Sequence, residues 1–178
     1  MLERQALEER FQTDVLLGDI TWETSYGLPG EGRPPRVLAE LGLEWPTWAQ
    51  TAYRNWYLEQ EYAEEPKIGI EITLRVQRLA EPVDPTVISH AIGSQTLTIG
   101  TEPIVAIGPT TETVYDPDLA VLSHGAELSF NGMYELEEKK LEDGSALDED
   151  FATIGGWVTS ALVRLGDLPL EYQPPEAE

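Results

Sequence analysis

The chain has no cysteine, two histidines and only 11 lysines and arginines against 33 aspartates and glutamates, so its 178 residues carry a formal net charge of −22. The absence of thiols excludes disulfide scaffolds, cysteine-ligated zinc, iron–sulfur clusters and cysteine nucleophiles. The scarcity of cations excludes a broad basic face that grips a phosphate backbone, and anionic membrane surfaces repel so acidic a chain. No apolar run approaches the ~20 residues that span a bilayer, and residues 1–11 contain no apolar signal-peptide core. We therefore expect a soluble, unexported protein that binds no membrane.

The motifs that carry catalysis, or that hold a metal or cofactor, are missing too. His90 and His124 lie in no HxH or HExxH pattern, and the chain has neither a GxSxG elbow nor a GxxxxGK[ST] phosphate loop. A calcium-binding EF-hand loop that began at Asp143 would have Leu147 and Ile154 at ligand positions. We therefore expect no enzyme, with no catalytic residue, no metal ligand and no cofactor. An enzyme without recognisable motifs stays as an alternative, and a deep pocket that joins either histidine to a carboxylate would support it.

Apolar residues make up 41% of the chain, and their spacing predicts one α+β domain over residues 1–168. Residues 67–79 give the clearest signal, because five aliphatic side chains alternate with other residues from Ile68 to Val76. Further strands are expected over residues 96–100, 103–109, 111–115 and 127–137. Together these strands predict an antiparallel or mixed β-sheet.

Three helices are expected to flank this sheet: an N-terminal helix, a short middle helix and a C-terminal helix. Residues 2–17 space apolar side chains three to five apart, which suits either an ordinary packing helix or one that docks on a neighbouring subunit. Asp84 followed by a proline predicts a helix that begins there and stops at Gly93. Residues 151–165 trace the apolar face of the C-terminal helix.

Three segments are expected to lie outside the regular elements. Residues 26–36 contain three glycines, three prolines and two arginines, and form either a projecting arm or a surface connection. Residues 137–150 are expected to form a solvated acidic loop, and residues 169–178 a proline-rich acidic tail.

Aromatic side chains gather in residues 44–62, which hold three of the five tryptophans and three of the seven tyrosines. Their spacing fits a helical stripe and a strand equally well, and the enrichment in aromatic residues and threonine slightly favours a strand. Such residues dominate buried interface patches, but a protein core also takes them up, so both placements stay open. The interface candidates are these aromatic residues together with two arginines of the proline-rich segment: Trp45, Trp48, Tyr53, Trp56, Tyr57, Arg33 and Arg36.

The basic residues are unevenly placed. No Lys or Arg occurs from Leu79 to Glu138, a stretch of sixty residues that contains ten acidic ones. Since these carboxylates have no cation nearby in sequence, the surface that they form is expected to be strongly electronegative. The candidate residues for this surface are Glu102, Glu112, Asp116, Asp118 and Glu127.

The order of the expected elements resembles the small neck and tail-terminator proteins of tailed bacteriophages, mainly through residues 67–92 and 126–138. Proteins of that kind have an N-terminal helix, an antiparallel sheet with a long amphipathic strand, an intervening helix and projecting loops. They form rings at the head–tail junction and act without catalysis. The resemblance implies a structural connector or tail terminator in the virion, assembled in the host cytoplasm, whose partners are copies of itself and neighbouring structural proteins. Electronegative walls would let DNA pass through such a ring as cargo that is not gripped.

A cytoplasmic binding module is the alternative from a different functional class. An acidic mimic of DNA, or another acidic partner-binding protein, predicts a monomer or dimer whose acids are spaced like phosphates on an outer face. A ring protein predicts self-association through the aromatic segment and the loops. The oligomeric state therefore separates the two hypotheses.

Overall fold

The computed structural model describes residues 20–28, 34–59, 61, 67–93, 97–99, 102–135 and 144–175. Within this part of the chain the elements are β1 (Ile20–Gly27), β2 (Val37–Trp45), α2 (Thr47–Tyr57), β3 (Lys67–Leu79), α3 (Pro85–Ile92), β4 (Leu97–Ile99), β5 (Glu102–Tyr115), β6 (Val121–Glu135) and α5 (Gly144–Gly166). The expected N-terminal helix over residues 2–17 lies outside the described residues.

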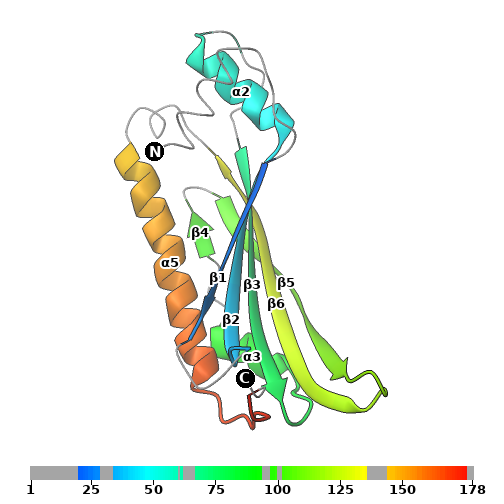
Figure 1. Cartoon of the computed structure of the whole chain (residues 1–178). Coiled ribbons are helices and arrows are strands. Elements are labelled where there is room, and N and C mark those ends of the chain that lie inside the picture. The colour runs from blue at the N-terminus through cyan, green and yellow to red at the C-terminus, as the bar shows by residue number, and fades with distance from the viewer. Residues whose placement is uncertain are drawn as a thin grey trace.

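The strands form one six-stranded sheet in the order β1-β2-β3-β6-β5-β4, and every neighbouring pair is antiparallel. Each of its two halves is a run of strands that are consecutive in the sequence, and the β3–β6 pairing joins them. The sheet curls, with α5 running along its concave side and α3 near one end (Figure 1). This arrangement confirms the α+β class and makes the sheet antiparallel throughout.

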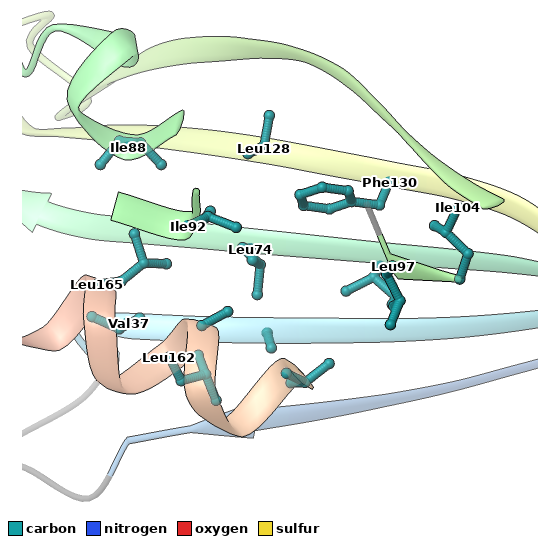
Figure 2. Packing of buried hydrophobic residues seen from close by; sticks show 14 of the residues in the cluster. Val37, Leu74, Ile88, Ile92, Leu97, Ile104, Leu128, Phe130, Leu162 and Leu165 are labelled. Atoms are coloured by element: carbon teal, nitrogen blue, oxygen red, sulfur yellow. The ribbon is translucent and has the colours of Figure 1, made fainter. Parts of the chain in front are cut away.

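The core lies between the concave face of the sheet and the helices α3 and α5 (Figure 2). Strand β3 contributes Ile70, Ile72, Leu74 and Val76, which are all buried, as its period-two pattern predicts. From α5 come Ile154, Val158, Ala161, Leu162 and Leu165, which recur at helical spacing on one side of the helix. Ile88 and Ile92 of α3 complete the contact. One face of each element is therefore buried in a shared apolar layer.

Helix α3 has the two ends that the sequence predicts. The Asp84 carboxylate accepts hydrogen bonds from the backbone N and the hydroxyl of Thr86, at 2.9 and 2.8 Å. These bonds favour the charged form and hold the pKa of the Asp84 carboxyl below its usual value. At the other end Gly93 has a φ of 80°, and its N–H donates to the carbonyls of Ser89 and His90.

The slight preference for a strand over residues 44–62 is wrong. Strand β2 ends at Trp45, and helix α2 follows from Thr47 to Tyr57. Pro46 explains the switch, because it has no N–H to continue the ladder and its carbonyl accepts the first helical bonds, from the N–H groups of Ala49 and Gln50 at 3.0 and 3.1 Å.

Other elements begin or end where the sequence did not indicate. Strands β1 and β2 were not predicted, and residues 144–150 belong to α5 instead of the expected acidic loop. Strand β5 is continuous across the two short strands expected there, because a shift of register between Ile107 and Thr110 absorbs Gly108 and Pro109. Strand β6 begins at Val121, well before residue 127.

The proline-rich tail docks on the end of β3. Tyr172 forms an antiparallel bridge with Leu79, and backbone bonds join Ala80 N to Glu171 O at 2.9 Å and Gln173 N to Arg78 O at 2.6 Å. The Arg36 guanidinium lies over the Tyr172 ring, 4.9 Å from its centroid. Leu168 and Leu170 pack against the core as well. The segment from residue 167 to residue 175 therefore extends the packing of the domain.

The packing of α5 predicts a contrast between two neighbouring side chains. Leu165 is fully buried, so Leu165→Ala is expected to lower the free energy of unfolding by about 2–5 kcal/mol through lost burial and the remaining cavity. Val163, on the same helix, is 47% exposed, and Val163→Ala is expected to change the free energy of unfolding by only ~0.5 kcal/mol. Urea unfolding of the two variants measures both changes, provided that the free energy of unfolding depends equally steeply on urea concentration in each. Equal losses would contradict this placement of the helix.

Tail docking is expected to weaken at high pH. Burial raises the pKa of the Tyr172 phenol above its usual value of 10.0, and Arg36 and Arg78 oppose the rise only in part. Because the folded state favours the neutral phenol, Tyr172 contributes to the free energy of unfolding at pH values below its ordinary pKa. This contribution is lost as the pH rises through the raised pKa. In an ultraviolet titration, Tyr172→Phe should remove one tyrosine from the late-titrating fraction. A loss from the normally titrating fraction would contradict the docked placement.

Candidate interaction surfaces

The convex face of the sheet, which points away from α3 and α5, is strongly acidic. Residues paired directly across neighbouring strands share a face, so the register places the outward-pointing charged residues as Glu23, Glu40, Glu44, Glu71, Glu112, Glu127, Glu135, Lys67 and Arg75. Seven glutamates against two cations give this face a net charge of −5 (−7 + 2). We call these nine residues and the strand surface between them the outward face.

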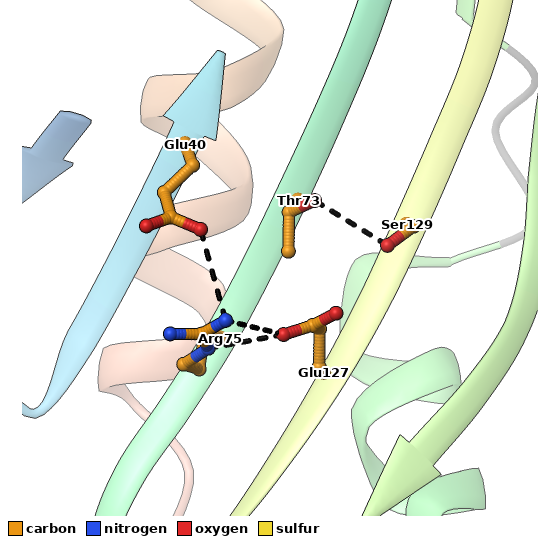
Figure 3. A network of polar contacts seen from close by, with 5 residues as sticks. All are labelled: Glu40, Thr73, Arg75, Glu127 and Ser129. Carbon is orange, nitrogen blue, oxygen red and sulfur yellow. Dashed lines mark hydrogen bonds and ion pairs between the residues drawn. The ribbon is translucent and has the colours of Figure 1, made fainter. Parts of the chain in front are cut away.

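The two cations of the outward face are held by glutamates. Arg75 donates to Glu127 Oε2 from Nε at 3.0 Å and from Nη2 at 2.6 Å, and Nη2 lies 3.7 Å from Glu40 Oε2 (Figure 3). The hydrogen bond with Glu127, and the charges of Glu127, Glu40 and Glu112, raise the pKa of Arg75. Lys67 Nζ lies 3.0 Å from Glu135 Oε1. Both cations are thus engaged within the face and offer little to an incoming phosphate.

Two hollows deepen the outward face between β1, β2, β3 and β6. They have volumes of about 340 and 230 Å³, and glutamates, including Glu23 and Glu71, line both. Gly42 and Gly69 lie in neighbouring strands there, and the lack of a side chain at both leaves the surface low. Among the described residues no group of three or more His, Asp or Glu could hold a metal ion. The hollows are therefore open acidic surface.

The candidates for the electronegative surface have different placements. Glu112 is exposed on the outward face, whereas Glu127 is paired with Arg75, a cation 52 residues away in the sequence. The Asp116 carboxylate accepts from the N–H groups of Asp118 and Ala120 at 2.9 and 2.8 Å, and thus shapes the turn between β5 and β6. Asp118 is exposed in this turn, and the side chain of Glu102 lies outside the described residues.

Sequence reasoning missed the apolar character of the β5–β6 hairpin. The hairpin extends past the rest of the sheet (Figure 1). Its large exposed apolar side chains are Val105, Ile107, Val114, Tyr115, Leu119, Val121, Leu122 and Met133, of which Leu119 at the turn is 80% exposed. The many apolar residues of this base-free stretch were a usable signal for such a surface, in addition to its charge. A concentration of exposed apolar side chains on one projecting element is typical of a contact site.

The interface candidates do not form one cluster. The rings of Trp45 and Tyr53 meet edge to face, with centroids 5.5 Å apart, where β2 leads into α2 at the end of the sheet (Figure 1). Gln50 Nε2 donates to Trp45 O at 3.0 Å. Arg36 lies elsewhere, on the ring of Tyr172. Nothing is described for Arg33 or for the side chains of Trp48, Trp56 and Tyr57.

A hollow between the hairpin, the end of β3 and the docked tail is lined by both a histidine and a carboxylate. It has a volume of about 370 Å³, and Glu112, Ser123 and His124 are among its lining residues. The described hydrogen bond of His124 joins Nδ1 to Thr113 Oγ1 at 3.2 Å, whereas in a Ser-His-Asp triad a carboxylate holds this nitrogen. His90 is exposed on α3.

Comparison with known proteins finds no family, no curated protein and no solved structure that matches this chain. Among the described residues, no helix is both long enough and apolar enough to cross a membrane.

The Arg75–Glu127 contact predicts a small, salt-dependent coupling. Both side chains are about 30% exposed, so a double-mutant cycle of Arg75→Gln and Glu127→Gln is expected to give ~0.2–1 kcal/mol at low ionic strength. The coupling should shrink towards zero in 1 M salt because ions screen it. Denaturant unfolding of the four proteins at both salt concentrations measures it. A coupling that salt leaves unchanged would contradict a solvent-accessible pair.

Proposed function

We propose that the protein is a non-catalytic structural subunit that assembles with copies of itself into a ring. In this proposal the ring is a connector or tail terminator at the neck or tail of a tailed bacteriophage, located in the virion. The outward face of the sheet lines its channel and faces passing DNA. The observation that carries the proposal is the net charge of −5 on the outward face, opposite the helices.

The physical reason lies in how a duplex meets a charged wall. DNA carries about one negative charge per 1.7 Å of its axis, and proteins hold it by placing cations against its phosphates. A wall with an excess of glutamates does the opposite and keeps the duplex away from its surface. Since Lys67 and Arg75 are engaged by Glu135 and Glu127, few cations on this wall would slow a moving duplex.

Self-association is supported by the β5–β6 hairpin. A subunit that exposes Val114, Tyr115, Leu119 and Val121 on one hairpin, with Tyr115 paired to Val121, leaves apolar surface in water, which contact with a neighbour would remove. A protruding element that contacts a different surface of the next copy makes a head-to-tail interface, and such interfaces close into rings when the rotation allows. The hairpin is thus the leading candidate for the contact between subunits.

An acidic mimic of DNA is the second candidate, and the same outward face favours it. A monomer could present these glutamates to the basic surface of a DNA-binding protein. The exposed apolar hairpin has no role in that function, which is why we place it second.

The proposal is tested by oligomeric state and by charge reversal of the outward face. Size-exclusion chromatography with light scattering, at low and high salt, is expected to show a concentration-dependent oligomer, and electron microscopy a ring with a central channel. The wild-type assembly should not bind double-stranded DNA at physiological salt. A fourfold variant with Glu40, Glu44, Glu71 and Glu112 each changed to Lys should bind it, with an affinity that falls steeply with salt.

The matched control carries the same net charge in another place. Changing Asp148, Glu149, Asp167 and Glu171, which are all exposed, to Lys also shifts the net charge from −22 to −14 (−22 + 8). This variant should bind DNA much more weakly than the outward-face variant. Equal DNA binding by both variants would contradict the proposal that the outward face lines the channel. A strict monomer at high concentration would contradict the ring and leave the DNA mimic.

A further inference from the structure

The outer edge of β5 is the longest unpaired strand edge among the described residues. Strand β5 pairs with β6 along one side, whereas on its other side β4 pairs only with residues 102–104. The remaining eleven residues of the strand, 105–115, have no strand beside them on that side within the described part of the chain. Such an edge presents backbone N–H and C=O groups with which a further strand can pair.

Residues 105–115 lack most of the features with which proteins protect a free edge. The segment contains no lysine or arginine, and all of it is exposed apart from Pro109, which is half-buried. Residues 110–114 form a regular ladder with β6 between two shifts of register, and four of these five residues are β-branched, which suits a strand. A long exposed edge of this kind is typical of a strand that pairs with another chain.

The opposite edge of the sheet offers a matching strand in a second copy. The described pairing of β1 is with β2 alone, so its outer side is also unpaired within the described ranges. Its eight residues fit along the eleven of β5 without reaching β4. Since direction alternates from strand to strand in this antiparallel sheet, β1 and β5 run in the same direction. A rotation about a channel parallel to the strands keeps that direction, so β5 would meet the neighbour's β1 as a parallel pair.

The charges of the two edges favour one alignment of this pair. Glu23 and Glu112 both point to the outward face, one on each edge. A pairing that set these two side by side would be destabilised, because like charges repel across a ladder. A shift of two residues keeps the faces matched and separates the two acids. In the direction that leaves all of β1 beside β5, this shift places Thr24 beside Thr111 on the side of the sheet that carries the helices.

We propose that β5 of one subunit pairs in parallel with β1 of the next, with residues 110–114 beside residues 23–27. This inference rests on the proposed function, because it identifies the two edges through which the subunits of the ring are joined. Each subunit offers one edge and receives the other, which is the head-to-tail contact that a rotation can close. Closure of the ring covers both free edges, as closure of a barrel does.

A pair of introduced cysteines tests this contact, since the chain contains none of its own. In the double variant Thr24→Cys, Thr111→Cys the two thiols of one chain lie four strand spacings apart, about 19 Å along the sheet, which is too far for a disulfide. Between neighbours in the ring they lie side by side. Mild oxidation of the assembled protein is therefore expected to link successive subunits and to give a ladder of covalent oligomers on a non-reducing denaturing gel.

The matched control replaces Thr111→Cys by Thr153→Cys, an exposed threonine on α5, and keeps Thr24→Cys. It reports disulfides that arise from random collisions. The two single variants, Thr24→Cys and Thr111→Cys, report contacts between like edges. Circular dichroism and light scattering before oxidation verify that each variant is folded and give its oligomeric state.

Each outcome decides the proposal. A ladder that forms with Thr24→Cys, Thr111→Cys, is at least tenfold weaker in the Thr153→Cys control and is absent from both single variants supports it. Linked dimers from either single variant would overturn it in favour of pairing between like edges. Rings that are visible by electron microscopy but form no ladder would overturn this inference alone. A strict monomer would overturn the proposed ring together with it.

Discussion

Side chains of strand β3 alternate between the apolar core and water, and the positions of the other elements depend on this alternation. Ile70, Ile72, Leu74 and Val76 point to the helices and are buried, while Glu71, Thr73 and Arg75 point the other way. Since β3 lies inside the sheet, its pairing with β2 and β6 passes the same alternation to both neighbours. The position of α5 and the acidity of the outward face are both consequences of how this one strand is oriented.

In the folded protein, much of the negative charge of the chain is gathered on one face of the sheet. Glutamates at alternate positions of several strands are brought onto one face because antiparallel neighbours share their orientation. The cations of that face are engaged by glutamates across the strands, so their effect on a distant phosphate is small. Apolar surface is concentrated on the β5–β6 hairpin. The register places Val105, Ile107 and Val114 on the outward face as well, so its acidic surface adjoins exposed apolar side chains along β5.

Local patterns in the sequence predicted the elements with a single strong periodicity. The strand over residues 67–79, the capped helix that follows Asp84 and the apolar face of α5 were predicted closely. Residues 44–62 were not, because their aromatic spacing satisfies two periodicities and Pro46 decides between them. The core side of the fold was accessible in this way since burial leaves a periodic trace in the sequence.

The candidate surfaces were less accessible, because they depend on contacts between distant positions. Arg75 and Glu127 are 52 residues apart, so the pair that neutralises part of the acidic stretch leaves no local signal. The exposure of Val121 and Leu122 depends on how far the hairpin extends beyond the sheet. A run of apolar residues has the same sequence pattern whether a helix covers it or it is exposed to water.

The joint between the two halves of the sheet has a consequence for how the chain folds. Strands β1 to β3 and strands β4 to β6 each pair with sequence neighbours, whereas the β3–β6 ladder brings together positions such as Leu74 and Leu128. Closing so long a loop is the slow part of forming such a sheet. The Arg75–Glu127 and Lys67–Glu135 pairs both cross this ladder. A slip of two residues would keep the apolar side chains inward, yet it would set Arg75 opposite Gly125 or Ser129, so these charges select the correct alignment when the halves meet.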